Sequence, residues 1–121
     1  MTKEQAIHTF WSSFGVSAYD ENTVPDDAQL PYITYEVATD SIGNVVISAA
    51  DIWDRSTSWQ GVTELKDAID AEIGYGGTTR HYDGGLLWIT KGTPFARRIP
   101  DTDGSIRHIA LNIESEFISE V

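Results

Sequence analysis

The sequence predicts an α+β fold in which a mainly antiparallel sheet carries two helices on one face. Two hydrophobic periodicities support this prediction. Apolar residues recur every three to four positions in two segments, as in helices with one buried stripe, and every second position in several others, as in strands with one covered face. The predicted order is helix, two strands, helix, three strands. Runs of strands joined by turns favour antiparallel pairing with the helices packed on one side.

The first helix is predicted close to the N-terminus. Thr2 and Gln5 form a capping-box pattern, and Gly15 marks the end of the helix. Its apolar stripe consists of Ile7, Phe10, Trp11 and Phe14. The polar residues 16–31 end at Pro31, which disfavours helix at the preceding position, and we predict a mobile loop there.

A hairpin and the second helix are predicted next. Tyr32–Val37 alternates as a strand does, and a turn centred on Ile42-Gly43-Asn44 leads to a second strand, Val45–Arg55. Thr57 or Ser58 is expected to cap the helix that follows, which ends at Gly74. Its apolar stripe is Val62, Leu65, Ile69 and Ile73, and its outer face is acidic, with Glu64, Asp67, Asp70 and Glu72.

Three further strands are expected in the C-terminal third. Residues 78–82 pair with 86–90 across Asp83-Gly84-Gly85, whose glycines allow the positive φ of a tight turn. The last strand covers residues 106–118. Between them Pro94 and Pro100 bracket a basic segment, residues 91–105, which we predict to be a mobile arm because proline cannot join a central ladder.

Length and composition indicate a single domain, residues 1–121. The 40% hydrophobic and 11% aromatic residues suffice for one core. The absence of cysteine excludes disulfides and thiolate metal sites. The N-terminal residues lack the apolar stretch of a signal peptide, and the longest apolar runs fall far short of the ~20 residues of a membrane span.

The net charge of −11 argues against sequence-specific or other direct nucleic-acid binding, which needs a basic face. The charge is uneven. Residues 1–79 hold three bases against thirteen acids, whereas residues 80–121 hold five bases against six acids. This asymmetry is compatible with an ordinary solvated surface, and also with complementary surfaces on neighbouring subunits.

The sequence contains no recognisable catalytic motif. The histidines, His8, His81 and His108, are far apart and lack metal-ligand spacing. The segment 101–104 lacks the later ligands of a calcium loop, and the glycine-rich 74–79 lacks the lysine of a P-loop. We therefore expect no catalytic residues, no metal, no cofactor and no enzymatic activity.

Four segments resemble a known family of phage proteins. Residues 23–35, 53–59, 87–96 and 111–117 are similar to small proteins encoded among the head–tail genes of long-tailed phages and prophages of Gram-positive bacteria. In broader shape the chain resembles the tail terminators. This resemblance implies an α/β sandwich whose copies close into a ring, with a hexamer expected. The ring would cap the last ring of tail-tube protein and help to join the tail to the head. The implied partners are further copies of the chain, the major tail-tube protein and a head connector protein, with no membrane. The implied location is the virion tail or neck, assembled in the host cytoplasm.

A ring requires two different patches that meet between subunits. The candidates are the acidic helix face, with Glu64, Asp67 and Asp70, and the basic arm, with Lys91, Phe95, Arg97 and Arg98. Two alternatives remain. One is another neck or head-completion connector, and the other is a small ligand-binding domain or enzyme with a cleft near Trp53, Trp59 and Trp88.

Overall fold

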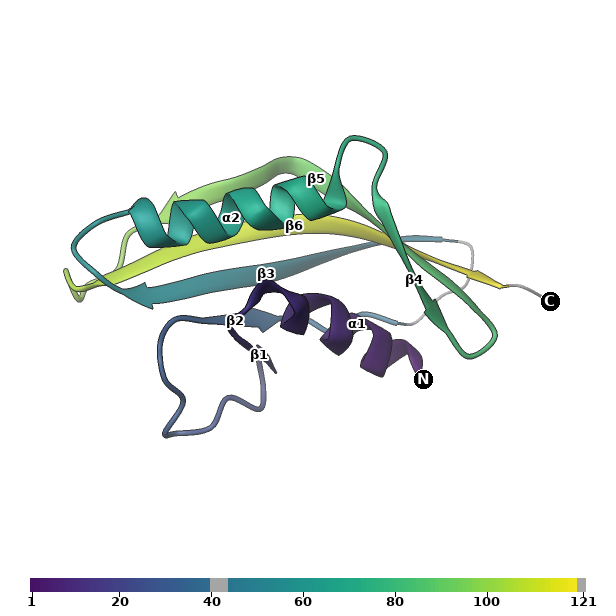
Figure 1. Cartoon of the computed structure of the whole chain (residues 1–121), viewed down its shortest axis with the longest axis horizontal. Coiled ribbons are helices and arrows are strands. Elements are labelled where there is room, and N and C mark those ends of the chain that lie inside the picture. Colours follow the sequence, from purple (N-terminus) through teal and green to yellow (C-terminus); the bar gives the residue numbers. More distant parts are fainter. Residues whose placement is uncertain (40–43, 120–121) are drawn as a thin grey trace.

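The computed structural model describes residues 1–39 and 44–119 (Figure 1). Within these ranges the elements are α1 (Lys3–Trp11), the 3-10 turn η1 (Ser12–Phe14), β1 (Ser17–Asp20), β2 (Tyr32–Tyr35), β3 (Val45–Arg55), α2 (Gln60–Ile73), β4 (Thr78–Tyr82), β5 (Gly85–Ile99) and β6 (Ile106–Ser119). The strands form one sheet in the order β1-β2-β3-β6-β5-β4. Only β1 and β2 pair in parallel among the described strands. The predicted α+β class with a mainly antiparallel sheet is confirmed.

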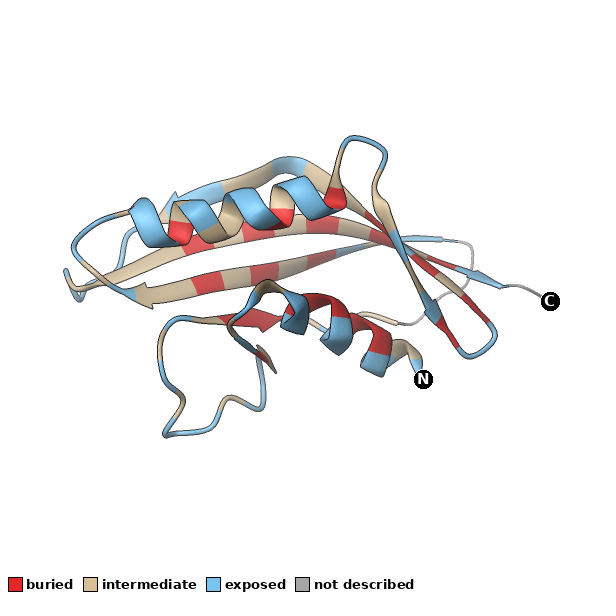
Figure 2. Ribbon diagram, in the orientation of Figure 1, coloured by how far each residue is buried: buried red, intermediate tan, exposed pale blue. Residues whose placement is uncertain are grey.

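Both helices pack on the same face of this sheet, which we call the covered face; the other is the open face. Figure 2 shows buried residues on the helix sides turned to the sheet and exposed residues on their outer sides. Phe10 and Trp11 of α1 lie beside Leu87 and Ile113. One hydrophobic core takes in residues of both helices and of all six strands. The predicted packing of both stripes on one face is confirmed.

The helix ends follow the sequence signals closely. The Gln5 N–H donates to Thr2 Oγ1 at 3.1 Å, and the Thr2 N–H donates to Gln5 Oε1 at 2.8 Å, which confirms the capping box. Gly15 has φ 82°, the left-handed conformation that glycine adopts without a steric penalty. The N-cap of α2 is Trp59, so the cap predicted at Thr57 or Ser58 is wrong in position, although Ser58 Oγ accepts from the Gln60 N–H.

The loop predicted over residues 16–31 is wrong at Ser17–Asp20, which is β1. This strand pairs in parallel with β2 and buries Ala18. Its four residues are too few and too polar to show a clear alternation, so the sequence signal was missed. The strand predicted over Tyr32–Val37 is confirmed but ends at Tyr35. Ile42 and Gly43 of the predicted turn lie outside the described residues.

The arm predicted over residues 91–105 is wrong up to Ile99, because β5 continues through it. Residues 96–99 pair with β6 after a register shift between Lys91 and Ala96. Pro94 lies inside that irregularity, where its missing N–H costs no ladder hydrogen bond. The Pro94 carbonyl accepts from Asn112 Nδ2 at 3.0 Å, which ties the irregular segment to β6. Only residues 100–105 remain as a connection between β5 and β6.

Candidate functional site

The basic segment forms a free edge of the sheet. β4 pairs with β5 only over Gly85–Ile89. Beyond this point no described strand pairs with the outer side of β5. Arg97 and Arg98, both exposed, therefore lie on a strand edge with a defined backbone. Up to Ile99 the predicted arm is thus a strand edge that carries basic side chains.

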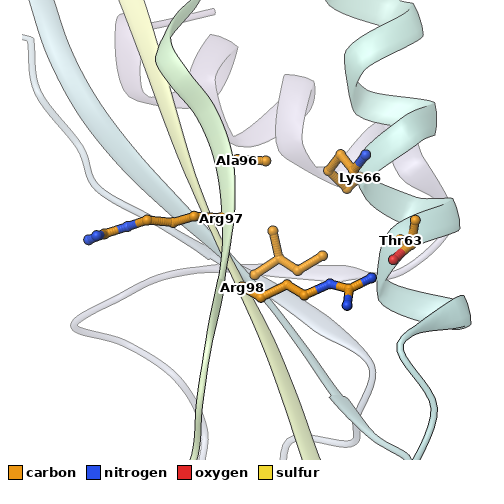
Figure 3. Close-up of a pocket in the computed structure, with 6 residues that line it drawn as sticks. Thr63, Lys66, Ala96, Arg97 and Arg98 are labelled. Atoms are coloured by element: carbon orange, nitrogen blue, oxygen red, sulfur yellow. The ribbon is translucent and has the colours of Figure 1, made fainter.

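The two arginines point to opposite faces (Figure 3). Arg98 pairs with the buried Ile109 of β6 and so lies on the covered face. Its guanidinium lies 4.7 Å from the centroid of the Trp59 ring, a favourable cation–π distance. Arg97 lies on the open face, and it makes no ion pair, hydrogen bond or ring contact with the described part of the chain. Arg98 is occupied within the chain, whereas Arg97 is available.

A groove of about 220 Å³ lies between α2 and β5 (Figure 3). It is lined by Thr63, Lys66, Ala96, Arg97, Arg98 and Ile109. Lys66 Nζ lies 2.6 Å from Asp67 Oδ1, so its charge is partly compensated. Phe95, another predicted interface residue, is half-buried against the core, with Lys91 Nζ 5.9 Å from its ring centroid. This groove is basic at its β5 side through Arg98, because the Arg97 side chain points to the open face, and it is close to neutral at its α2 side.

The acidic side chains of α2 have partners within the same chain. Asp70 Oδ1 lies 2.5 Å from Lys91 Nζ. Glu72 Oε1 pairs with Arg80 Nη2 at 2.8 Å, and Glu64 Oε1 accepts from the Gln60 side chain at 3.0 Å. Asp70 and Lys91, predicted on facing patches of two subunits, are thus brought together in one. Contacts of this face with another subunit would first have to compete with these pairs.

A second charged surface lies at the opposite edge of the sheet and was not predicted. It comprises β1 and the connection to β2, with the carboxylates of Asp20, Glu21, Asp26 and Asp27. In the described residues none of the four forms an ion pair with a basic side chain. Desolvation, followed by the like charges of Glu36, Asp51 and Asp20, raises the pKa of Glu21. This surface, which we call the acidic edge, carries negative charge that no nearby cation relieves.

A pocket of about 300 Å³ opens on the open face beside the acidic edge. It is lined by Glu21, Val24, Tyr32, Thr34, Asp51 and Trp53. Trp53 Nε1 donates to Thr34 Oγ1 at 3.0 Å, and the Trp53 ring stacks on His108 with centroids 3.7 Å apart. His108 Nε2 lies 2.6 Å from Asp51 Oδ1. These contacts hold the aromatic and acidic walls of the pocket in place.

Part of this pocket could be predicted from the spacing of its residues in the sequence. Tyr32, Thr34, Asp51 and Trp53 occupy alternate positions of two paired strands, so their side chains share one face of the sheet. The same alternation that predicts the buried side of these strands therefore also predicts this side. What the sequence could not reveal is that Glu21 and Val24 close the pocket from a connection, since periodicity does not place loops.

The three tryptophans of the predicted ligand cleft do not meet. Trp59 caps α2 on the covered side, whereas Trp53 and Trp88 lie on the open face opposite His108 and Glu116 of β6. At ~3.3 Å per residue these two positions of β6 are about 26 Å apart. Trp88 Nε1 donates to the Gly76 carbonyl at 3.1 Å. A cleft shared by all three is therefore not formed.

No metal-binding cluster of three or more histidine, cysteine or acidic side chains is present in the part of the chain that the structure describes. Among the described helices, neither combines the length and apolar character needed to cross a membrane.

Comparison with known proteins shows a shared fold. No family model matches the sequence, and no curated protein matches it either. A chain from the virion of a native gene transfer agent particle is similar in structure, with a TM-score of 0.64 and 15% sequence identity. The match covers 96% of this chain and 94% of that chain, so the two share the fold over nearly their whole lengths.

Proposed function

We propose that this chain is a structural protein of a phage-like virion, and that within the virion it is a tail terminator. The observation that carries the proposal is the fold shared, over nearly the whole chain, with a component of a gene transfer agent virion. The four sequence segments that resemble phage head–tail proteins support it independently. A protein of this kind acts by binding and needs no catalytic group.

A ring is the assembly that the charge distribution favours. The sheet has a basic edge at β5 and an acidic edge at β1, and these two unlike patches can meet only between different copies in a head-to-tail contact. Repetition of such a contact closes a ring when the rotation between subunits allows it. We propose a hexamer, by the resemblance to tail terminators, seated on the major tail-tube protein and facing a head connector.

The experiment mixes the purified chain with the major tail-tube protein of its gene cluster and measures tube length by electron microscopy. Tubes that stop growing and carry the chain at one end are the expected result, with tube protein alone as the control. Unchanged tube lengths and no bound chain would contradict the terminator role. Binding to the purified head connector in its place would assign the chain to another position in the neck.

A further inference from the structure

The two charged edges lie at opposite sides of one sheet and differ in how well their charges are satisfied. From β1 to β5 there are four strand spacings, or about 19 Å. Figure 1 shows the connection after β1 extending away from the sheet on the side far from β5. Arg97 at one edge and Glu21 at the other have no ionic partner within the described residues.

The pocket at the acidic edge has the chemistry that binds a guanidinium group. Glu21 supplies a carboxylate without an ionic partner, and Asp51 supplies a second one that it shares with His108. Tyr32 and Trp53 supply aromatic walls. A guanidinium can stack on such rings while it donates hydrogen bonds in its own plane to carboxylates. The volume of about 300 Å³ leaves room for a side chain to enter.

Arg97 is not bound to the pocket of its own chain. Within one chain, Arg97 and Asp51 both lie directly opposite Ala110, one on each neighbouring strand, and all three side chains are on the open face. The backbones of Arg97 and Asp51 are therefore two strand spacings, or about 10 Å, apart. No ion pair joins them. The free guanidinium and the free pocket of one molecule are therefore available to other molecules.

We propose that Arg97 of one copy inserts into the pocket formed by Glu21, Tyr32, Asp51 and Trp53 of the next copy. The contact joins the basic edge of one sheet to the acidic edge of its neighbour, and it is the subunit contact of the ring. This inference rests on the proposed function. It assigns Arg98 a different role, because its guanidinium stays stacked on Trp59 of its own chain.

The alternative partner for Arg97 is the outer face of α2, and the intramolecular pairs disfavour it. Asp70 is bound to Lys91 and Glu72 to Arg80. A new contact with either would exchange one ion pair for another and gain little, and Glu64, which has no basic partner among the described residues, is tested by E64K below. At the pocket, by contrast, Glu21 has no cation to give up.

The test is a charge swap measured by sedimentation velocity over a concentration series. R97E and E21K should each weaken self-association by at least about 100-fold, because like charges then face each other at the contact. An equimolar mixture of R97E and E21K should recover to within about tenfold of the wild type. When the two variants alternate around the assembly, position 97 of each copy again faces an opposite charge at position 21 of the next copy. The double variant R97E/E21K should recover in the same way.

Two matched controls identify the partner surface. K3E reverses a basic residue at the start of α1, beside Tyr82 and Phe117 and away from both surfaces, and should assemble as the wild type does. E64K reverses a carboxylate of the α2 face and should neither impair assembly nor restore R97E. Urea midpoints of all variants check that the fold is retained.

The outcomes separate this contact from the proposed function. A wild-type assembly that R97E leaves intact, or rescue of R97E by E64K in place of E21K, would overturn the contact and leave the ring standing. An assembly that stops at two copies would indicate face-to-face pairing of open faces and overturn the head-to-tail arrangement. A wild-type chain that stays monomeric at every concentration, and on tail tubes, would overturn both.

Discussion

Phe117 and Ile118 are neighbours on β6, yet they lie in very different surroundings. Phe117 is fully buried on the covered face, with its ring edge-on to Tyr82, whereas Ile118 is 37% exposed on the open face. The same contrast holds along the sheet, since Ile52 is fully buried and Ile47 is 73% exposed. The covered face carries the apolar burial that stabilises the fold. The open face contributes less, and its residues are therefore free to serve contacts with other molecules.

The sharpest test of this contrast is alanine at the two neighbouring positions. Phe117→Ala removes a fully buried aromatic ring and should lower the free energy of unfolding by about 3–5 kcal/mol. Ile118→Ala should cost less than about 1 kcal/mol because its side chain already contacts solvent. Urea denaturation followed by circular dichroism measures both. Similar losses at the two positions would mean that the open face is covered by something outside the single chain.

A smaller effect is expected at the cluster of Asp51, Trp53 and His108 on the open face. Asp51→Ala removes the carboxylate that His108 contacts and should lower the free energy of unfolding by about 1–2 kcal/mol. This is the range for a hydrogen bond with a charged partner that is still partly solvated. Asp51→Asn keeps an acceptor oxygen and should cost less. The same urea titration reports both values. A loss of about 3–5 kcal/mol in the free energy of unfolding would mean that this cluster stabilises the fold as much as a buried core side chain does.

The most exposed apolar residue on the open face should matter least. Ile47→Thr keeps a β-branched side chain in β3 and should change the free energy of unfolding by no more than about 0.5 kcal/mol. The measurement is repeated at several protein concentrations. A cost that grows with concentration would show that Ile47 is buried when copies associate.

The turn between β5 and β6 provides a test by pH. Hydrogen bonds from the Ser105 N–H and then its hydroxyl, together with Arg55, lower the pKa of Asp103 from 3.8, against a small opposing desolvation. Because the folded-state pKa is depressed, the contribution to stability is present above pH 3.8 and is lost as pH falls through the folded value. Urea midpoints between pH 2 and pH 7 should show this acid-side loss in the wild type and a smaller loss in Asp103→Asn.

Periodicity predicted most of the fold because the covered face is apolar and regular. The bounds of β3 and β4, both buried stripes and the capping box of α1 were all predictable from residues spaced by two or by 3.6. Two strand segments were missed for local reasons. β1 has only four residues and depends on pairing with a strand distant in sequence, and Pro94 in β5 is accommodated by a register shift that no sequence pattern indicates.

The candidate site was predictable only as an inventory of charges. The sequence located the basic residues but could not show that Asp70 and Lys91 neutralise each other, or that Arg97 and Arg98 face opposite ways. These facts follow from strand register and from contacts between distant residues. They change which acidic surface is the better partner for the basic edge.

The opposite charge of the two sheet edges also limits how copies can meet wrongly. Two molecules brought together by their β5 edges would place arginines against arginines, and two β1 edges would place carboxylates against carboxylates. Both encounters are repulsive and are discouraged before any contact forms. The register shift at Pro94 further interrupts the free edge of β5, so an unrelated strand finds a poor template there. In the proposed ring this repulsion favours a single polarity, with all subunits pointing the same way.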